Sequence, residues 1–269
     1  MYKERLIESF KNLKFLLFVP DLAMIIISFL LGLSFVKYSG ITEFFNANNN
    51  LIDSFDTLIP LLSNFIQDNI LIFAIYLVLF FITGFILGSG INAMKFGMMK
   101  DIVERKKLEF KKMLSYGKKY FWDIVLMRLT IFIISLMVLL FFGILIILNA
   151  LNTFYSQIFF LIIFGLFLIT LFLLSLLLLF RYPALLIDRK NPMEIIKSLY
   201  SLLLKNFKYI FITWFIIFLF GLIILLLDFS LNIAYGATLM IILIVIRYAI
   251  SLVYGVWSNL FLFYMYKLK

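Results

Sequence analysis

Long apolar stretches alternate with short charged segments along the whole chain. Each stretch is close to the roughly 20 residues that a helix needs to cross the hydrocarbon core of a bilayer. Because hydrocarbon offers the backbone no hydrogen-bond partners, such stretches cross as α-helices. The pattern predicts one all-α polytopic membrane domain over residues 1–269, a bundle of six transmembrane helices: Phe15–Val36, Ile70–Ala93, Ile124–Leu148, Ile158–Phe180, Tyr209–Leu227 and Ala237–Met265.

The connections between these spans differ in length. Asn149–Gln157 and Asp228–Gly236 are short, which predicts tight hairpins between spans three and four and between spans five and six. Lys37–Asn69 is longer, and its apolar residues from Leu51 to Ile66 recur at helical spacing. We expect an amphipathic helix there, bent at Pro60, which serves either as a lid over an external opening or as a loop without function.

Basic residues predict the orientation of the spans. Met1–Lys14 holds four, Lys95–Lys119 nine, Arg181–Lys208 six and the C-terminal tail two of the 24 lysines and arginines. The opposite loops hold Lys37 beside five acidic residues, Glu43, Asp53, Asp56, Asp68 and Asp228. Because positively charged segments stay in the cytoplasm, both termini are predicted to be cytoplasmic in a cell membrane.

The amino-acid composition argues against several classes of protein function. The chain is 65% hydrophobic and 14% charged, its mean hydropathy is +1.14, and it contains neither cysteine nor histidine. We therefore predict no catalytic residue, no metal ligand and no cofactor, and we expect a protein that is not an enzyme. The net charge of +10 lies beside apolar spans, which favours the bilayer and anionic lipid headgroups over nucleic acid as partners.

The basic segments resemble one another. Val103–Lys107 matches Ile187–Asn191, and Lys118–Phe121 falls opposite Lys205–Lys208, which in turn resembles Lys11–Lys14. The pattern predicts a threefold repeat of one amphipathic helix plus two spans. Its units cover about residues 1–94, 95–157 and 181–269, and span 158–180 completes the second unit.

Each basic segment is predicted to form a cytoplasmic amphipathic helix at the membrane surface. In the third, Asn191 is the expected N-cap, Pro192 the first helical residue and Glu194 the third. Basic side chains of these segments are candidate contacts for lipid headgroups, namely Lys106, Lys107, Lys111, Lys112, Arg189 and Lys190.

Polar residues inside the spans form a candidate intramembrane site. Arg247 lies ten residues into the last span, about 15 Å deep at 1.5 Å per residue. The whole set is Arg247, Ser251, Asp21, Asn92, Arg128 and Arg181. Two interpretations remain open: the polar groups hold helices together, or they line a cytoplasm-facing cavity for an anionic headgroup or solute.

Part of the chain resembles a known family. The run from Arg181-Tyr182-Pro183 through Ile187–Ser198 to Lys205-Asn206-Phe207 is similar to the signature loop of the membrane domain attached to some glycerophosphodiester phosphodiesterases, and to related stand-alone archaeal membrane proteins of unknown function. The resemblance covers the last three spans and implies a six-span domain without an activity of its own. Phosphodiesterase catalysis is not carried over, because the histidine-rich catalytic domain has no counterpart here.

Two functions are consistent with these features. The favoured one is a non-enzymatic membrane scaffold or accessory subunit that interacts with lipids or with a membrane protein partner through its basic face. The alternative is a transporter or channel for a small or lipid-like anionic solute, suggested by the repeats and by Arg247. The composition, rich in Lys, Asn, Ile and Phe, favours a prokaryotic and specifically an archaeal source.

The orientation can be tested with single cysteines, because the chain has none of its own. Asn49→Cys should react with an impermeant maleimide added outside intact cells, whereas Ser115→Cys and Ser201→Cys should react only after lysis. Labelling of Ser115→Cys in intact cells would contradict the six-span topology.

Overall fold

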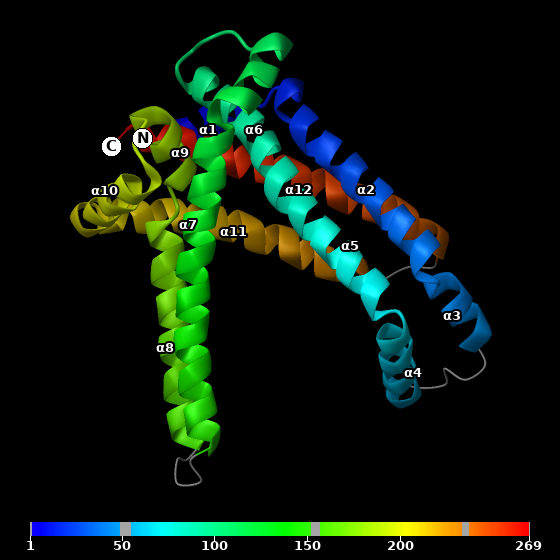
Figure 1. The fold of residues 1–269 in the computed structure, drawn as a ribbon. Helices are drawn as coiled ribbons and strands as arrows, with labels where there is room; N and C mark the ends of the chain where they lie inside the picture. Colours follow the sequence, from blue (N-terminus) through cyan, green and yellow to red (C-terminus); the bar gives the residue numbers. More distant parts are fainter. Residues whose placement is uncertain (1, 49–54, 152–156, 233–236, 269) are drawn as a thin grey trace. The chain divides into compact units, whose positions relative to one another are not determined.

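Every element in the described part of the chain is a helix (Figure 1). The computed structural model describes residues 2–48, 55–151, 157–232 and 237–268. The elements are α1 (Tyr2–Lys11), η1 (Phe15–Leu17), α2 (Val19–Ser39), α3 (Ile41–Asn48), α4 (Phe55–Asp68), α5 (Ile70–Ile82), η2 (Thr83–Leu87), α6 (Gly88–Val103), α7 (Phe110–Leu151), α8 (Gln157–Leu177), α9 (Arg181–Asp188), α10 (Pro192–Lys205), α11 (Phe207–Asn232) and α12 (Ala237–Tyr266).

Six helical segments are long and apolar enough to cross a membrane. This confirms the number and the approximate positions of the predicted spans. The segments are Phe15–Ser39, Ile70–Val103, Phe110–Asn149, Phe159–Asp188, Phe207–Leu226 and Val245–Tyr266.

The chain divides into two compact units. The smaller unit covers Val19–Ile91, in which α2 packs against α5. Phe35 of α2 meets the rings of Phe73 and Tyr76 edge to face, at centroid distances of 5.4 and 5.2 Å. A π-helical turn, η2, separates α5 from α6, and such turns replace the regular i→i+4 hydrogen bonds locally.

The predicted external helix corresponds to α4, which contains Pro60 and packs against α5. A further short helix, α3, precedes it and follows Gly40, whose φ of +70° suits glycine. Leu51, Ile52 and the labelling position Asn49 lie outside the described residues.

The larger unit comprises Met1–Phe18 and Asn92–Lys269. Within it α7 pairs with α8 and α11 pairs with α12, which confirms the two predicted hairpins. Helix α1 packs along α12, so the two ends of the chain lie side by side in this unit (Figure 1). The connecting residues 152–156 and 233–236 are outside the described part.

The buried core of the larger unit lies at one end of its spans, the end rich in basic residues. Buried side chains concentrate in residues 93–103, 176–186, 195–202 and 256–266. Aromatic rings join these segments: Phe96 stacks on Tyr182 at 4.4 Å, and Phe180 lies 5.7 Å from Tyr266. This region is called the basic-end core below.

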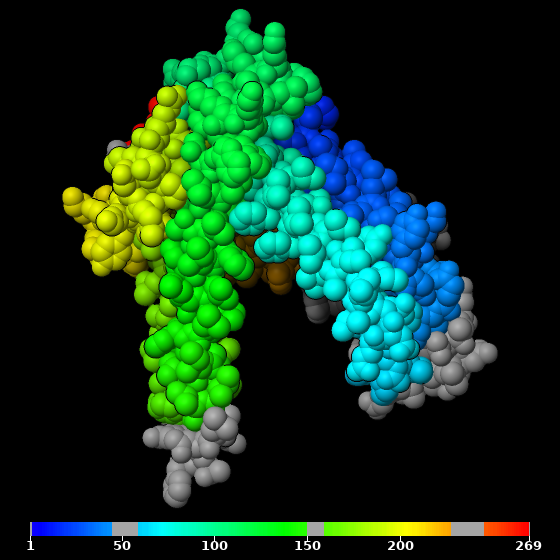
Figure 2. Space-filling model, in the orientation of Figure 1, coloured from blue at the N-terminus to red at the C-terminus, as the bar shows by residue number. Residues whose placement is uncertain are grey.

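Beyond the basic-end core, the spans expose most of their apolar side chains. Figure 2 shows α7, in green, with its side chains open along the viewed face. Leu139 is 60% exposed and Leu161 of α8 is 64% exposed. Such surfaces suit acyl chains, which are as apolar as leucine.

One predicted element is wrong in its boundaries. The second basic segment forms no separate amphipathic helix, because α7 runs without a break from Phe110 to Leu151. In the other two segments an asparagine follows the helix: α1 ends at Lys11 before Asn12, and α10 ends at Lys205 before Asn206. The second segment has Lys119 at that place, and lysine favours a continuing helix more than asparagine does.

The third segment begins as predicted, since Pro192 starts α10 and Asn191 stands at its N-cap with extended backbone. The Asn191 side chain, however, makes no capping hydrogen bond.

Two arginines end helices in the left-handed conformation. Arg105 has a φ of 61° and Arg189 a φ of 54°, and they are the non-glycine residues with positive φ in the described ranges. At the end of α6, the amides of Arg105 and Lys106 donate to the carbonyls of Ile102 and Asp101, at 2.9 and 2.8 Å. This is the bonding of a Schellman motif, in which the left-handed place is usually taken by glycine.

Glycines allow α6 and α7 to approach closely. A Cβ on Gly97 would lie 2.6 Å from the Cβ of Tyr116, and a Cβ on Gly117 would lie 2.8 Å from Cε of Met94. Both glycines are buried. The backbone of each helix, at its glycine, can therefore lie against a side chain of the other helix, close to the 104–109 connection.

Gly97→Ala should destabilise the protein by about 1–3 kcal/mol, because Tyr116 Cβ is fixed by its own backbone and cannot give way. The melting temperature in detergent, followed by tyrosine and tryptophan fluorescence, measures the change. Gly165→Ala in α8 is the matched control, since nothing lies within 4 Å of its added Cβ. A loss of stability no larger for Gly97→Ala than for Gly165→Ala would refute the close approach.

Candidate functional site

The basic-end core contains charged side chains that donate to the ends of neighbouring helices. Lys100 of α6 is buried, and its Nζ donates to the carbonyl of Leu186 at 2.6 Å. Leu186 is in the last turn of α9, whose final carbonyls have no partner within the helix. The lysine thus satisfies an orphan acceptor and places a positive charge at the negative end of the α9 dipole.

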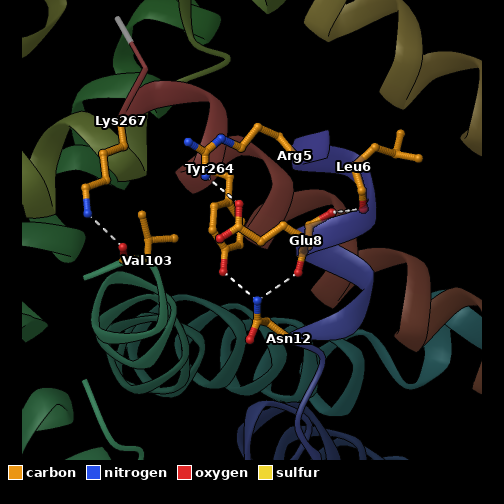
Figure 3. Close-up of polar contacts among 8 residues, drawn as sticks. Arg5, Leu6, Glu8, Asn12, Val103, Tyr264 and Lys267 are labelled. Carbon is orange, nitrogen blue, oxygen red and sulfur yellow. Dashed lines mark hydrogen bonds and ion pairs between the residues drawn. The ribbon is translucent and has the colours of Figure 1, made fainter. Parts of the chain in front are cut away.

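A second lysine does the same for α6. Lys267 follows α12, and its Nζ donates to the carbonyl of Val103, the last residue of α6, at 2.8 Å (Figure 3). Two lysines therefore link three helices in sequence, α12 to α6 and α6 to α9.

Glu104 lies among these positive charges. Its carboxylate is 3.8 Å from Lys100 Nζ and accepts a hydrogen bond from Lys106. Burial acts to raise the pKa of Glu104, but the Lys106 hydrogen bond and the charges of Lys100, Lys106 and Lys267 outweigh it and lower the pKa below its usual value. Glu104 therefore stays ionised at neutral pH and partly neutralises the lysines.

Two tyrosines bond to aspartates in the same region. The Tyr116 hydroxyl of α7 donates to Asp101 of α6, which is buried. The Tyr266 hydroxyl of α12 donates to Asp188 Oδ2 at 2.6 Å, at the last residue of α9. Hydrogen bonds to an ionised group are stronger than neutral ones, so these pairs hold the helix ends in register.

Helix α1 attaches to α12 through a separate set of polar contacts (Figure 3). Asn12 Nδ2 donates to the Glu8 carbonyl at 2.9 Å and to the Tyr264 hydroxyl at 2.8 Å. The buried indole of Trp257 donates from Nε1 to Ser9 Oγ at 3.0 Å. The N-terminal helix is thus tied to the last span by specific bonds as well as by apolar packing.

The predicted intramembrane residues do not share one environment. Asp21 belongs to the smaller unit, and Asn92 and Arg128 are half-buried in α6 and α7 of the larger unit. Arg247 and Ser251 are on an exposed face of α12. That these residues line a cavity stays a prediction.

Arg181, the remaining member, begins α9. Its guanidinium carbon lies 4.9 Å from the Tyr182 ring centroid, a cation–π distance, and its Nη1 is 3.5 Å from the Leu178 carbonyl. The residue therefore contributes to the junction between α8 and α9.

The six predicted headgroup contacts are all exposed: Lys106, Lys107, Lys111, Lys112, Arg189 and Lys190. Acidic neighbours partly compensate two of them, since Lys106 pairs with Glu104 and Lys112 Nζ lies 3.0 Å from Glu109. Their exposure contrasts with Lys95 and Lys100, which are buried.

The residues that join the helix ends were not among the predicted site residues. Lys100 and Lys267 entered only in the count of basic residues, and Asp101 and Asp188 lie inside two of the basic segments. A usable signal for the two lysines was their position directly after apolar residues, as in Met98-Met99-Lys100 and Met265-Tyr266-Lys267. Which carbonyl each lysine reaches depends on helix packing and could not be derived from spacing.

Among the described residues there is no group of three or more Asp, Glu, His or Cys side chains that could hold a metal ion. The contacts of Lys100, Lys267, Tyr116 and Tyr266 join helix ends to one another. Arg181 differs, because its buried Nε has no hydrogen-bond partner among the described residues. The arrangement accordingly supports helix assembly.

Comparison of the chain with models of protein families, with curated proteins and with solved structures finds no match.

Lys100→Met should destabilise the protein by about 1–3 kcal/mol, because it keeps the apolar volume but leaves the Leu186 carbonyl without its donor. Unfolding in detergent measures the loss. The control is Lys107→Met, an exposed lysine for which we expect a change within about 0.5 kcal/mol. Equal stability of the two variants would show that the buried lysine contributes nothing to the junction.

Proposed function

We propose that this protein is a non-enzymatic, six-span membrane scaffold or accessory subunit that binds anionic lipids through its cytoplasmic face. The observation that carries the proposal is the division among its basic residues. Lys100 is buried and bonds to the end of α9, whereas Lys106, Lys107, Lys111, Lys112, Arg189 and Lys190 are exposed. The exposed set is available to headgroups, each contributing about 1 kcal/mol near an anionic surface.

The orientation belongs to the same proposal. Both termini lie in the cytoplasm, because 21 of the 24 basic residues are in segments on that side. The bonding of α1 to α12 agrees with this arrangement, since it brings both ends of the chain to the same end of the spans.

The threefold repeat is a further part of the proposal, and two structural details support it. Arg105 and Arg189 occupy matched positions and share the left-handed conformation, which is uncommon for arginine. The ends of α6 and α12 also correspond at constant spacing, with the pairs Asn92 and Asn259, Phe96 and Phe263, Met98 and Met265, and Lys100 and Lys267. An ancestral two-span unit would explain why each of these lysines bonds to the end of another helix.

The resemblance to the membrane domain of glycerophosphodiester phosphodiesterases fits a scaffold. In such fusions a separate domain supplies catalysis, so the membrane part would anchor or position a partner. We propose a corresponding role here, in a prokaryotic and specifically archaeal cell membrane, with a membrane protein as the possible partner.

A transporter or channel for an anionic solute is the second candidate, and Arg247 is the observation that favours it. Placing a guanidinium about 15 Å into a span costs free energy, so a charged residue at this depth is a candidate for a function. Uptake of a labelled anion into proteoliposomes, compared between the native protein and Arg247→Met, distinguishes the two functions. Flux that depends on Arg247 would support the transporter.

The lipid proposal predicts the behaviour of a quadruple variant, in which Lys106, Lys107, Lys111 and Lys112 are all replaced by glutamine. Retention of phosphatidylglycerol during purification, measured by native mass spectrometry, should fall by more than tenfold, because the attraction of several lysines is lost. Binding by the native protein should also weaken as salt rises from 0.05 to 0.5 M, since salt screens exposed charges (about 10 Å Debye length at 0.1 M).

Replacement of the same four lysines by arginine is the control, because it keeps the charge. That variant should retain the lipid. Equal retention by the glutamine and arginine variants would leave the four lysines with a topological role alone and would overturn the proposal.

A further inference from the structure

An apolar groove lies between α1, α11 and α12 of the larger unit. Its volume is about 300 Å³, at the low end of the roughly 300–1,000 Å³ found for ligand pockets. The lining comes from three separate helices: Phe10 of α1, Phe220 and Ile224 of α11, and Ala249, Ile250, Val253, Tyr254 and Trp257 of α12.

The polar atoms of the groove's aromatic residues are engaged elsewhere. The Tyr254 hydroxyl donates to the Ile217 carbonyl at 2.8 Å, and the Trp257 indole donates to Ser9. A Cβ on Gly221 would lie 2.8 Å from the Tyr254 hydroxyl, so glycine at 221 permits that bond. These bonds hold in place two rings that line the groove, which is therefore preorganised for an apolar occupant.

The groove has exposed side walls and a buried base. Phe10 is 41% exposed and Val253 is 42% exposed, while Trp257 at its base is buried. Phe10 stacks on Trp257 at a centroid distance of 4.9 Å, so the N-terminal helix forms one wall. From Trp257 to Ala249 the groove follows α12 for about 12 Å, at 1.5 Å per residue, away from the basic end of the span.

Positive charge stands at the α1 end of the groove. Lys11 follows Phe10 directly, and Lys14 lies four residues beyond it. Both lysines are exposed, whereas Arg5 of the same helix pairs with Glu8. An apolar groove with two exposed lysines close to its interfacial end in the chain is complementary to a phospholipid that carries a negative headgroup.

We propose that this groove binds one hydrocarbon chain of an anionic phospholipid of the inner leaflet, with the headgroup at Lys11 and Lys14. The inference rests on the proposed membrane orientation and adds a defined lipid site, distinct from the exposed lysines of the 104–112 region. Apolar contacts alone would not favour this lipid over its neighbours, because bulk acyl chains are equally apolar. Selection therefore comes from the shape of the groove together with the two lysines.

The fluorescence of Trp257 can report whether the groove is occupied. The double variant Trp122→Phe/Trp214→Phe leaves it as the single tryptophan, and bromine atoms on an acyl chain quench tryptophan fluorescence only at close contact. In phosphatidylcholine vesicles, brominated phosphatidylglycerol should quench Trp257 more strongly than an equal fraction of brominated phosphatidylcholine. Replacing Lys11 and Lys14 by glutamine should reduce this preference, by about fivefold per lysine.

A groove-filling variant tests the location. Ala249→Phe should lower quenching by both lipids, whereas Leu139→Phe, on an exposed face of α7, should leave it unchanged. Equal quenching by the two brominated lipids, or quenching unaffected by Ala249→Phe, would overturn the proposed site. Should the reporter background not fold, phosphatidylglycerol retention by Ala249→Phe in the native background, measured by native mass spectrometry, gives the same decision.

The experiments distinguish a failure of the proposed site at the exposed lysines from a failure of the proposed groove site. If the glutamine variant of Lys106, Lys107, Lys111 and Lys112 keeps both its lipid retention and the Trp257 preference, the exposed lysines are not a lipid site but the groove is. If that variant loses retention while the parent shows no Trp257 preference, the basic face binds lipid and the groove does not.

Discussion

The ends of α6 and α9 lie inside packed protein, where their last carbonyl groups lack partners within their own helices. Lys267 and Lys100 supply those partners, and in doing so they connect α12 to α6 and α6 to α9. Nearby, the glycines at 97 and 117 leave room for the side chains of Tyr116 and Met94, so that α6 and α7 approach closely. Glu104 and the Tyr116–Asp101 pair then balance the buried charge.

Because the specific contacts are concentrated at one end, the rest of each span needs only to be helical and to present apolar side chains. Beyond the basic-end core, the large exposed side chains of α7 and α8 are apolar, and each helix satisfies its own backbone hydrogen bonds, as a bilayer demands. Lipid contact imposes little selection on which apolar residue stands at a given place, which explains long runs of Leu, Ile and Phe. The identity of individual residues matters instead at the basic end, where a single Gly, Lys or Tyr determines how two helices pack.

The six spans, the two hairpins and the start of α10 could be predicted, because they depend on apolar run length and on local capping chemistry. The separate second amphipathic helix was predicted by analogy and was wrong, since Lys119 does not interrupt a helix as Asn12 and Asn206 do. The left-handed Arg105 and Arg189 could not be foreseen, because glycine, the residue that usually takes this place, stands at neither position. The lysine contacts were missed because they depend on how the helices pack, whereas the depth of Arg247 in its span is visible in the sequence.

In this arrangement a basic-end core holds the spans together while their remaining lengths face lipid. Photolabelling in vesicles tests it directly, using a phospholipid with a diazirine near the end of its acyl chain and mapping the modified residues by mass spectrometry. We expect labels on exposed positions such as Leu139, Leu161 and Ile223, and none on Met99, Phe261 or Met265. Labelling of the latter three, or protection of Leu139 and Leu161 in the monomeric protein, would contradict it.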